Sequence, residues 1–335
     1  MSSYIELLNE ISLEINIFLG LTFFILGFIG NIFNIILFSS LFNIKIFPPI
    51  PGRVYLLIVS IANFIFVGYL LLTRILISAF SIPLTNTYDV ICKSRFYIGQ
   101  VTMYTSLYTT CFATIDQYFS TNRSVRIRQL SKMSFAKSIV SISIFIWILI
   151  NTPILKLYQL YPRANSASTV CTVYSSSWSF YYTYFQSLIF LCIIPMSLFI
   201  LFSILTYRNI HSSQRINRII SNQMNQLVVL QSTTMFISLF VATIQIIYQN
   251  VTANLVKDQL RSAQDNLFNT LANLFTYVHY IGGFYIYFLS SKSFRKKLFD
   301  QIFKRNQSIQ SNGTRSMWSH KIGQFQKTSG PPMNG

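Results

Sequence analysis

Seven long apolar runs follow one another along this chain of 335 residues and limit what it can fold into. A helix needs about 20 apolar residues to cross a bilayer, and each run reaches that length. A membrane β-barrel would instead show stretches of about ten residues with alternating hydrophobicity, and none is visible. The sequence therefore predicts an all-α fold with seven transmembrane helices, over residues 17–43, 54–78, 94–119, 138–157, 181–207, 225–249 and 266–290.

The composition also indicates a membrane protein. Hydrophobic residues make up 52% of the chain and charged residues 10%, whereas soluble domains carry about 25% charged residues. A soluble core of this size would leave much of that apolar surface exposed, which nearly excludes a cytosolic enzyme. The net charge of +18 favours the anionic surface of a lipid bilayer over nucleic acid, because the cations lie between apolar runs.

Motifs of covalent chemistry are missing from the sequence. It contains no CxxC or HxxxH pair, its three histidines are far apart, and it has no Gly-rich phosphate-binding loop. These patterns indicate metal-binding, phosphate-binding and nucleophile sites in a sequence. We therefore predict no catalytic residues, no metal site and no cofactor.

Lysine and arginine residues gather in every second loop and in the C-terminal tail. The positive-inside rule places these segments in the cytoplasm and the N-terminus outside the cell, with the chain in the plasma membrane. We expect an extracellular tail over 1–16, the bundle over 17–290 and a flexible cytoplasmic tail over 306–335. The sequon at Asn250 then lies in an outside loop, where it can be glycosylated.

An amphipathic helix is predicted directly after the seventh span, over residues 291–305. Apolar residues recur there at helical spacing, with lysines and arginines around them. Such a helix lies on the inner leaflet of the membrane. The apolar face consists of Phe294, Leu298, Phe299, Ile302 and Phe303.

Several residues stand in the order and at the spacing of one receptor family: Gly30-Asn31, Cys92, Asp116-Gln117-Tyr118, Trp147, Pro195, Tyr287 and Phe294. Tyr287 and Phe294 keep the spacing of that family's Asn-Pro-x-x-Tyr motif and the Phe after it. On these residues the chain resembles the rhodopsin-like, or class A, G protein-coupled receptors over roughly 20–305.

The resemblance implies roles for particular residues. It joins Cys92 to Cys171 by a disulfide, and it makes Asn31 and Asn63 polar residues of the core. It also assigns activation and G protein coupling to Asp116, Gln117, Tyr118, Asn222, Phe236, Phe240 and Tyr287.

Four positions depart from the family pattern. Gln117 replaces the family's Arg, and Asn63 replaces its sodium-binding Asp. Gly283 replaces the Asn of the seventh helix, and Ala242 replaces the Pro of the sixth. The Arg of the family meets the G protein, so these departures bear on how efficiently the chain couples.

The ligand class is narrowed by what certain positions lack. Gly99 stands where amine receptors carry an Asp, which disfavours a monoamine ligand. The seventh span has no Lys to hold retinal, so an opsin is excluded. The β-branched run around Cys171 resembles the hairpin of peptide receptors, so an extracellular peptide is the preferred ligand. Polar residues of the outer half of the bundle are the pocket candidates: Arg74, Gln100, Tyr104, Tyr184, Gln186, Thr243, Gln245, Asn273 and Tyr277.

The sequence is thus interpreted as a receptor that transduces an extracellular ligand to a heterotrimeric G protein and is not an enzyme. One alternative is a ligand-binding receptor with weak or no G protein coupling, because Gln117 replaces Arg. The other is a transporter or channel, which would need polar residues in register through its core. That core holds few such residues beyond Asn63, Asp116 and His279.

Overall fold

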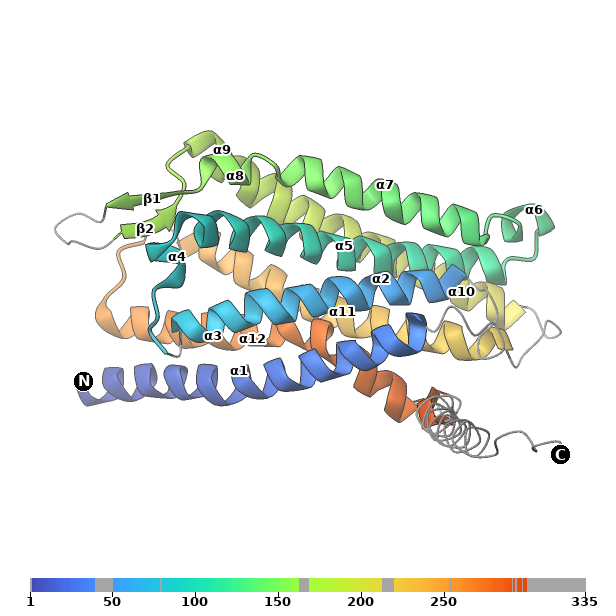
Figure 1. The fold of residues 1–335 in the computed structure, drawn as a ribbon, viewed down its shortest axis with the longest axis horizontal. Coiled ribbons are helices and arrows are strands. Elements are labelled where there is room, and N and C mark those ends of the chain that lie inside the picture. The colour runs from blue at the N-terminus through green and yellow to red at the C-terminus, as the bar shows by residue number, and fades with distance from the viewer. Residues whose placement is uncertain are drawn as a thin grey trace, which may run out of the picture. The chain divides into compact units, whose positions relative to one another are not determined.

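Helices make up almost all of the described chain (Figure 1). The computed structural model describes residues 2–39, 51–78, 80–162, 169–212, 220–252 and 255–290, together with Lys292, Phe294, Arg295, Lys296, Leu298 and Phe299. The chain forms two compact units, Met1–Ser290 and Ser291–Gly335.

Each predicted span lies, as far as it is described, in one long helical segment of the first unit. Four of these segments are single helices: α1 (Ser2–Ser39), α5 (Asp89–Thr121), α11 (Ile220–Thr252) and α12 (Gln259–Ser290). The fourth segment along the chain is α7 (Met133–Asn151), which ends just before Pro153 and is followed by the short helix α8 (Ile154–Leu157). Proline breaks the helix there because it has no backbone N–H to donate.

The second and fifth segments contain turns of the wider π-helical type. The second runs through α2 (Pro51–Ile65), η1 (Phe66–Leu71) and α3 (Leu72–Ser78). The fifth runs through α9 (Ser176–Phe180), η2 (Tyr181–Ile193) and α10 (Ile194–Ser212). Short helices in the connections are α4 (Leu84–Thr87) and α6 (Val125–Arg128).

A two-stranded hairpin lies at the end of the bundle that also carries the N-terminus (Figure 1). Strands β1 (Gln159–Pro162) and β2 (Thr169–Thr172) pair antiparallel. Cys171 in β2 forms a disulfide with Cys92 near the start of α5, with Cα atoms 5.7 Å apart. The backbone N–H of Cys171 also donates to the side-chain oxygen of Asn86, at 3.2 Å. The hairpin is therefore fixed to both α4 and α5.

Within the described residues, five helical segments are long and apolar enough to cross a membrane: Ser3–Ser39, Pro51–Ser78, Met133–Leu157, Ser176–Asn209 and Val228–Thr252. Large apolar side chains stand exposed on them, such as Phe18 at 69% and Phe145 at 60%, as expected for surfaces that face lipid. Helices α5 and α12 have 33 and 32 residues but are less apolar. Several of their polar side chains, Ser106 and Thr270 among them, are buried within the bundle.

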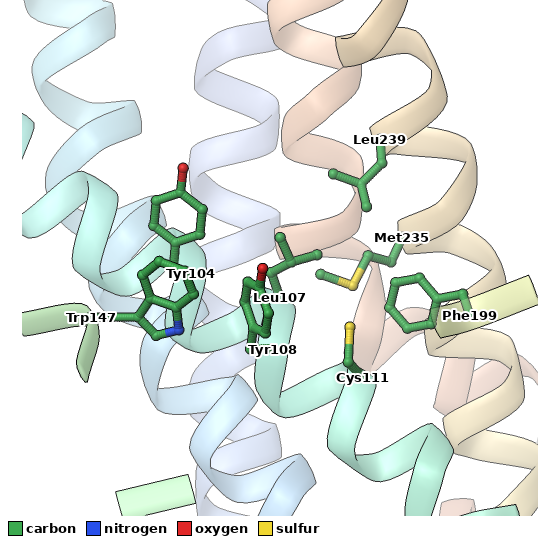
Figure 2. Close-up of a cluster of buried hydrophobic side chains, with 8 residues drawn as sticks. All are labelled: Tyr104, Leu107, Tyr108, Cys111, Trp147, Phe199, Met235 and Leu239. Carbon is green, nitrogen blue, oxygen red and sulfur yellow. The ribbon is translucent and has the colours of Figure 1, made fainter. Parts of the chain in front are cut away.

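Two apolar clusters pack between the helices. One joins α5, α7, α10 and α11, and Figure 2 shows its eight side chains: Tyr104, Leu107, Tyr108, Cys111, Trp147, Phe199, Met235 and Leu239. In it the ring of Tyr104 stacks on that of Trp147, with centroids 4.3 Å apart. The second cluster joins η1 and α3 to α12 through Phe66, Val67, Leu71, Ile75, Tyr277, Tyr280 and Ile281.

One predicted segment differs from the sequence-based expectation, and another is described only in part. Residues 2–16 do not form a free tail, because α1 begins at Ser2 and Leu8, Ser12 and Asn16 are buried. In the second unit, the described residues from Lys292 to Phe299 are helical. Ile302 and Phe303 lie outside the described residues, so the amphipathic membrane-surface helix over 291–305 stays a prediction.

Replacing Cys92 with Ser should lower the free energy of unfolding by about 2–4 kcal/mol, because the disulfide restricts the unfolded chain. Thermal unfolding of the purified protein, with and without a reducing agent, measures this. Reduction should lower the unfolding temperature of the wild-type protein and leave that of Cys92→Ser unchanged. An equal response of the two proteins would contradict the structural role of this bond.

Candidate functional site

A polar cavity of about 560 Å³ lies at the N-terminal end of the bundle, between α1, α3 and α12. Its polar residues recur at helical spacing, so each helix presents them along one face. The lining residues are Asn9, Ser12, Leu13 and Asn16 of α1, Arg74 and Ser78 of α3, and Asn266, Asn269, Thr270 and Asn273 of α12.

Hydrogen bonds between side chains hold α1 and α12 together along this cavity. The hydroxyl groups of Ser12 and Thr270 lie 3.0 Å apart. The amide of Asn16 donates to the backbone oxygen of Ser12 at 3.0 Å and to the Thr270 hydroxyl at 3.4 Å. The first turns of α1 are thus a wall of the cavity.

Arg74 supplies the positive charge of the cavity. Its Nε is buried and has no hydrogen-bond partner among the described residues. Arg95 lies nearby, because its Nε donates to the hydroxyl of Thr73 at 3.0 Å. Both guanidinium groups act electrostatically on the buried Tyr277. Within the described part of the chain, neither arginine pairs with a carboxylate.

Such an arrangement suits an anion. Arg74 is half-buried, and a partly desolvated cation without a counter-charge is unfavourable; a ligand carboxylate would supply that charge together with hydrogen-bond acceptors. The asparagine amides and the hydroxyl groups around Arg74 can donate further hydrogen bonds. Within the described residues, no group of three or more His, Cys, Asp or Glu side chains is placed to hold a metal ion.

Helices α11 and α12 are joined beside the cavity by two sets of polar contacts. In the first, the side-chain oxygen of Asn269 accepts from the amides of Gln249 at 3.1 Å and Gln245 at 3.4 Å. In the second, Tyr248 donates to Asp265 at 2.5 Å and Lys257 forms an ion pair with Asp265 at 2.6 Å. Only the first set includes a residue that lines the cavity.

Among the predicted ligand residues, the structure brings Arg74 and Asn273 to the cavity wall. Gln245 reaches the wall through Asn269, and Tyr277 lies beside the two guanidinium groups. These four candidates share one end of the bundle.

Three other predicted ligand residues bind neighbouring helices. The amide of Gln100 donates to the hydroxyl of Tyr182 at 2.7 Å. The hydroxyl of Tyr104 donates to the backbone oxygen of Gln186 at 2.6 Å, and the amide of Gln186 donates to Asn151 at 2.5 Å. These contacts join α5, α7 and η2, so the structure uses them in helix packing.

The last two ligand candidates lie away from the cavity. Thr243 donates to the backbone oxygen of Leu239 in its own helix, at 2.7 Å. The side chain of Tyr184 is 46% exposed on the outer face of η2. Asn250, the predicted glycosylation position, is exposed near the end of α11, and its amide donates to the oxygen of Ile246 at 2.9 Å.

The residues predicted for activation lie away from this cavity. Asp116 and Gln117 are buried, at 6% and 4% exposure, while Tyr118 is half-buried. Ser131 donates a hydrogen bond to the Asp116 carboxylate. The ring of Tyr118 packs against Phe202, with centroids 5.6 Å apart. The Asp-Gln-Tyr segment thus ties α5 to α10 and to the loop after α6.

The two predicted core asparagines are buried and make hydrogen bonds between helices. The amide of Asn31 donates to the backbone oxygens of Gly27 and Tyr280, at 2.8 and 2.9 Å. The side-chain oxygen of Asn63 accepts from the hydroxyl of Ser106 at 2.6 Å. They link α1 to α12 and α2 to α5.

A buried polar chain that the sequence did not indicate connects α11 with α12. The hydroxyl of Tyr287 donates to the side-chain oxygen of Gln231 at 2.9 Å. The amide nitrogen of Gln231 lies 3.3 Å from Nδ1 of His279. A Cβ at Gly283 would lie 3.0 Å from the Gln231 oxygen, so a larger residue there would require the end of this side chain to shift by a few tenths of an ångström.

One residue predicted for activation is exposed and does not enter the core. Phe240 is 53% exposed, while Met235 and Leu239 enter the core cluster (Figure 2). Phe236 is half-buried and lines a second cavity of about 290 Å³ between α10 and α11. The side chain of Asn222 lies outside the described residues.

The sequence-based interpretation missed Asn269 and Gln231. Polar residues at spacings of three and four along α1 and α12 were the available signal for the cavity, since they mark one face of each helix. Asn9, Ser12 and Asn16 follow this spacing, as do Asn266 and Asn269. Treating residues 1–16 as a tail concealed it.

The ion pair of Asp265 gives the protein a predicted pH dependence. The hydrogen bond from Lys257, followed by that from Tyr248, lowers the pKa of Asp265 below its ordinary value of 3.8. A lowered pKa in the folded state means that the carboxylate stabilises the fold above the unfolded pKa. This contribution is lost as the pH falls through the folded pKa.

Asp265→Asn should therefore lower the free energy of unfolding by about 1–2 kcal/mol at pH 7. The difference from wild type should persist at pH 5 and shrink as the pH approaches 3. Thermal unfolding at these three pH values measures it. Asp89→Asn is the control, because its ion pair with Lys93 is exposed and contributes little. A difference that grows toward pH 3 would contradict the assignment.

Comparison with known proteins gives partial matches. No family model matches the chain. It is 30% identical to succinate receptor 1 of Mus musculus over 157 residues, which is 46% of this chain and 46% of the relative. It is 27% identical to succinate receptor 1 of Rattus norvegicus over 213 residues, or 62% of this chain and 64% of the relative. The chain thus spans less than two thirds of the length of these relatives.

Proposed function

We propose that this chain, whose relatives are rhodopsin-like receptors and not enzymes, is itself a plasma-membrane receptor with seven spans and an extracellular N-terminus. The resemblance predicted from the sequence motifs is confirmed by those relatives. In this proposal an outside ligand shifts the helix bundle between two arrangements, and the cytoplasmic end acts on a heterotrimeric G protein.

The proposed ligand is a small molecule with one or more carboxylates. The unpaired guanidinium of Arg74 in the polar cavity is the observation that carries this proposal. A volume of about 560 Å³ lies within the range of small-molecule sites. The relatives are receptors for succinate, which has two carboxylates, and Arg95 offers a second cation close to the first.

This proposal replaces the peptide that the sequence favoured. The relatives give no support to a peptide ligand. The N-terminal segment, expected to be an extracellular tail, is the beginning of α1, and it packs on α12 through Ser12 and Thr270. The charge in the cavity is positive, so it favours an anion.

Arg74→Gln should weaken binding of succinate by about 10- to 100-fold, the effect of losing a charge-assisted hydrogen bond. Binding of radiolabelled succinate to the protein in lipid nanodiscs measures it. Arg261→Gln is the matched control, because Arg261 is exposed and does not line the cavity. Equal binding by Arg74→Gln and wild type would refute Arg74 as the anion site.

The buried position of Gln117 supports a second candidate function, that of a receptor that couples weakly to its G protein. Gln117 lies beside Asp116 where the family has Arg, and glutamine cannot supply the five-donor fork of a guanidinium. A receptor that binds its ligand and couples weakly is consistent with this residue. The next experiment distinguishes weak from efficient coupling.

Gln117→Arg should raise maximal succinate-stimulated GTP exchange by about twofold or more and leave basal exchange unchanged, because Arg restores a bidentate contact. Exchange on added heterotrimeric G protein measures both values. Gln117→Lys should raise the maximum less, since Lys is a single-point donor. A revertant no better than wild type at saturating ligand would show that coupling does not use this position.

A further inference from the structure

We propose that Asn269 is the residue through which the cavity acts on α11. This inference rests on the proposed function, since it requires an anion bound beside Arg74. A bound carboxylate would then strengthen the contact between α11 and α12 at the N-terminal end of the bundle. Asn269 is a positioning residue for the signal as well as part of the cavity wall.

The position of Asn269 is unusual among the residues of the cavity. It lines the cavity from α12, and its side-chain oxygen accepts from both Gln249 and Gln245 of α11. Its own amide nitrogen donates to none of the described residues. The two sides of one amide therefore serve different purposes, the oxygen bound to α11 and the nitrogen free to donate to a ligand.

The amide group of Asn269 provides the physical link between the bound ligand and helix α11. When a carboxylate accepts a hydrogen bond from an amide nitrogen, the amide is polarised and its oxygen becomes a better acceptor. Both glutamine contacts should then strengthen together. The contact of Gln245 is long, at 3.4 Å, so it has room to shorten when the oxygen becomes more negative.

Helix α11 carries this change toward the middle of the bundle. A helix of 33 residues is about 50 Å long at 1.5 Å per residue. Gln231 lies about five turns before Gln249 on the same helix and is bound to Tyr287 of α12. The helix is thus tied to α12 at two levels, and a tighter contact at one level alters the geometry at the other.

The second contact between the two helices provides a matched control. Tyr248 is adjacent to Gln249 on α11 and donates to Asp265 of α12 at 2.5 Å. Neither Tyr248 nor Asp265 lines the cavity. Removing this hydrogen bond weakens the same helix pair without breaking the path from ligand to α11.

The test uses the double variant Gln245→Leu/Gln249→Leu, the single variant Gln249→Leu and the control Tyr248→Phe. Succinate is the probe, and its affinity is measured in nanodiscs with and without heterotrimeric G protein. Coupling between two sites is reciprocal, so a G protein that responds to ligand must also raise ligand affinity. A purely structural defect would instead change the affinity in both conditions.

For wild type and Tyr248→Phe, we expect G protein to raise succinate affinity by about tenfold, within the usual range of coupling. For the double variant, the rise should fall below about threefold, and the readout is the ratio of the affinities with and without G protein. Gln249→Leu, which changes only an exposed side chain, should be intermediate. Measurable succinate binding without G protein shows that the variants are folded.

The possible failures are distinguishable. Wild-type protein that binds no succinate, or whose affinity ignores G protein, refutes the proposed function and this inference with it. Wild-type protein with both properties, together with a double variant that keeps the full rise, refutes the inference alone. An equal loss in Tyr248→Phe would also overturn it, because any contact between α11 and α12 would then suffice.

Discussion

Hydrogen bonds from polar side chains of α5 hold the rest of the bundle around this helix. Ser106 donates to α2, Tyr108 to a backbone oxygen of η2, and Thr114 shares a hydrogen bond with α11. Lipid offers no partners for such groups, so they are satisfied only when the neighbouring helices are in place. This requirement explains why the central helix is less apolar than those around it.

The middle of the bundle is joined by uncharged groups. Gln231 connects Tyr287 with His279, and Asn63 accepts from Ser106. Hydrogen bonds of this kind contribute about 1 kcal/mol each between membrane helices, much less than a buried ion pair costs to separate. Two arrangements of the helices that differ in such bonds differ little in free energy, so a ligand of the proposed kind would have enough binding energy to choose between them.

The long helices could be predicted from the sequence because hydropathy over 20 residues depends little on tertiary contacts. The disulfide between Cys92 and Cys171, which the resemblance implied, is present in the structure. The direction of single side chains was harder to predict. Phe240 is exposed while Leu239 is buried, so the spacing of the family motif did not predict which of these two side chains enters the core.

The polar cavity could not be predicted because it depends on how two distant segments meet. Asn9 and Asn16 were interpreted as part of a solvated tail, and only the packing of α1 on α12 brings them to Asn266 and Asn269. Local sequence patterns identify the face of each helix but do not show which faces meet. Arg74 was among the predicted pocket residues, but most of the residues that line the cavity with it were not.

The close fit of Gln231 against Gly283 also restricts how this sequence can vary. The family's polar residue on the seventh helix is absent here, and a longer polar side chain from α11 occupies the space. A side chain at position 283 and a glutamine at position 231 would compete for the same volume. Asparagine at 283 would therefore displace the end of the Gln231 side chain and favour a smaller residue at 231, so the two positions should tend to change together.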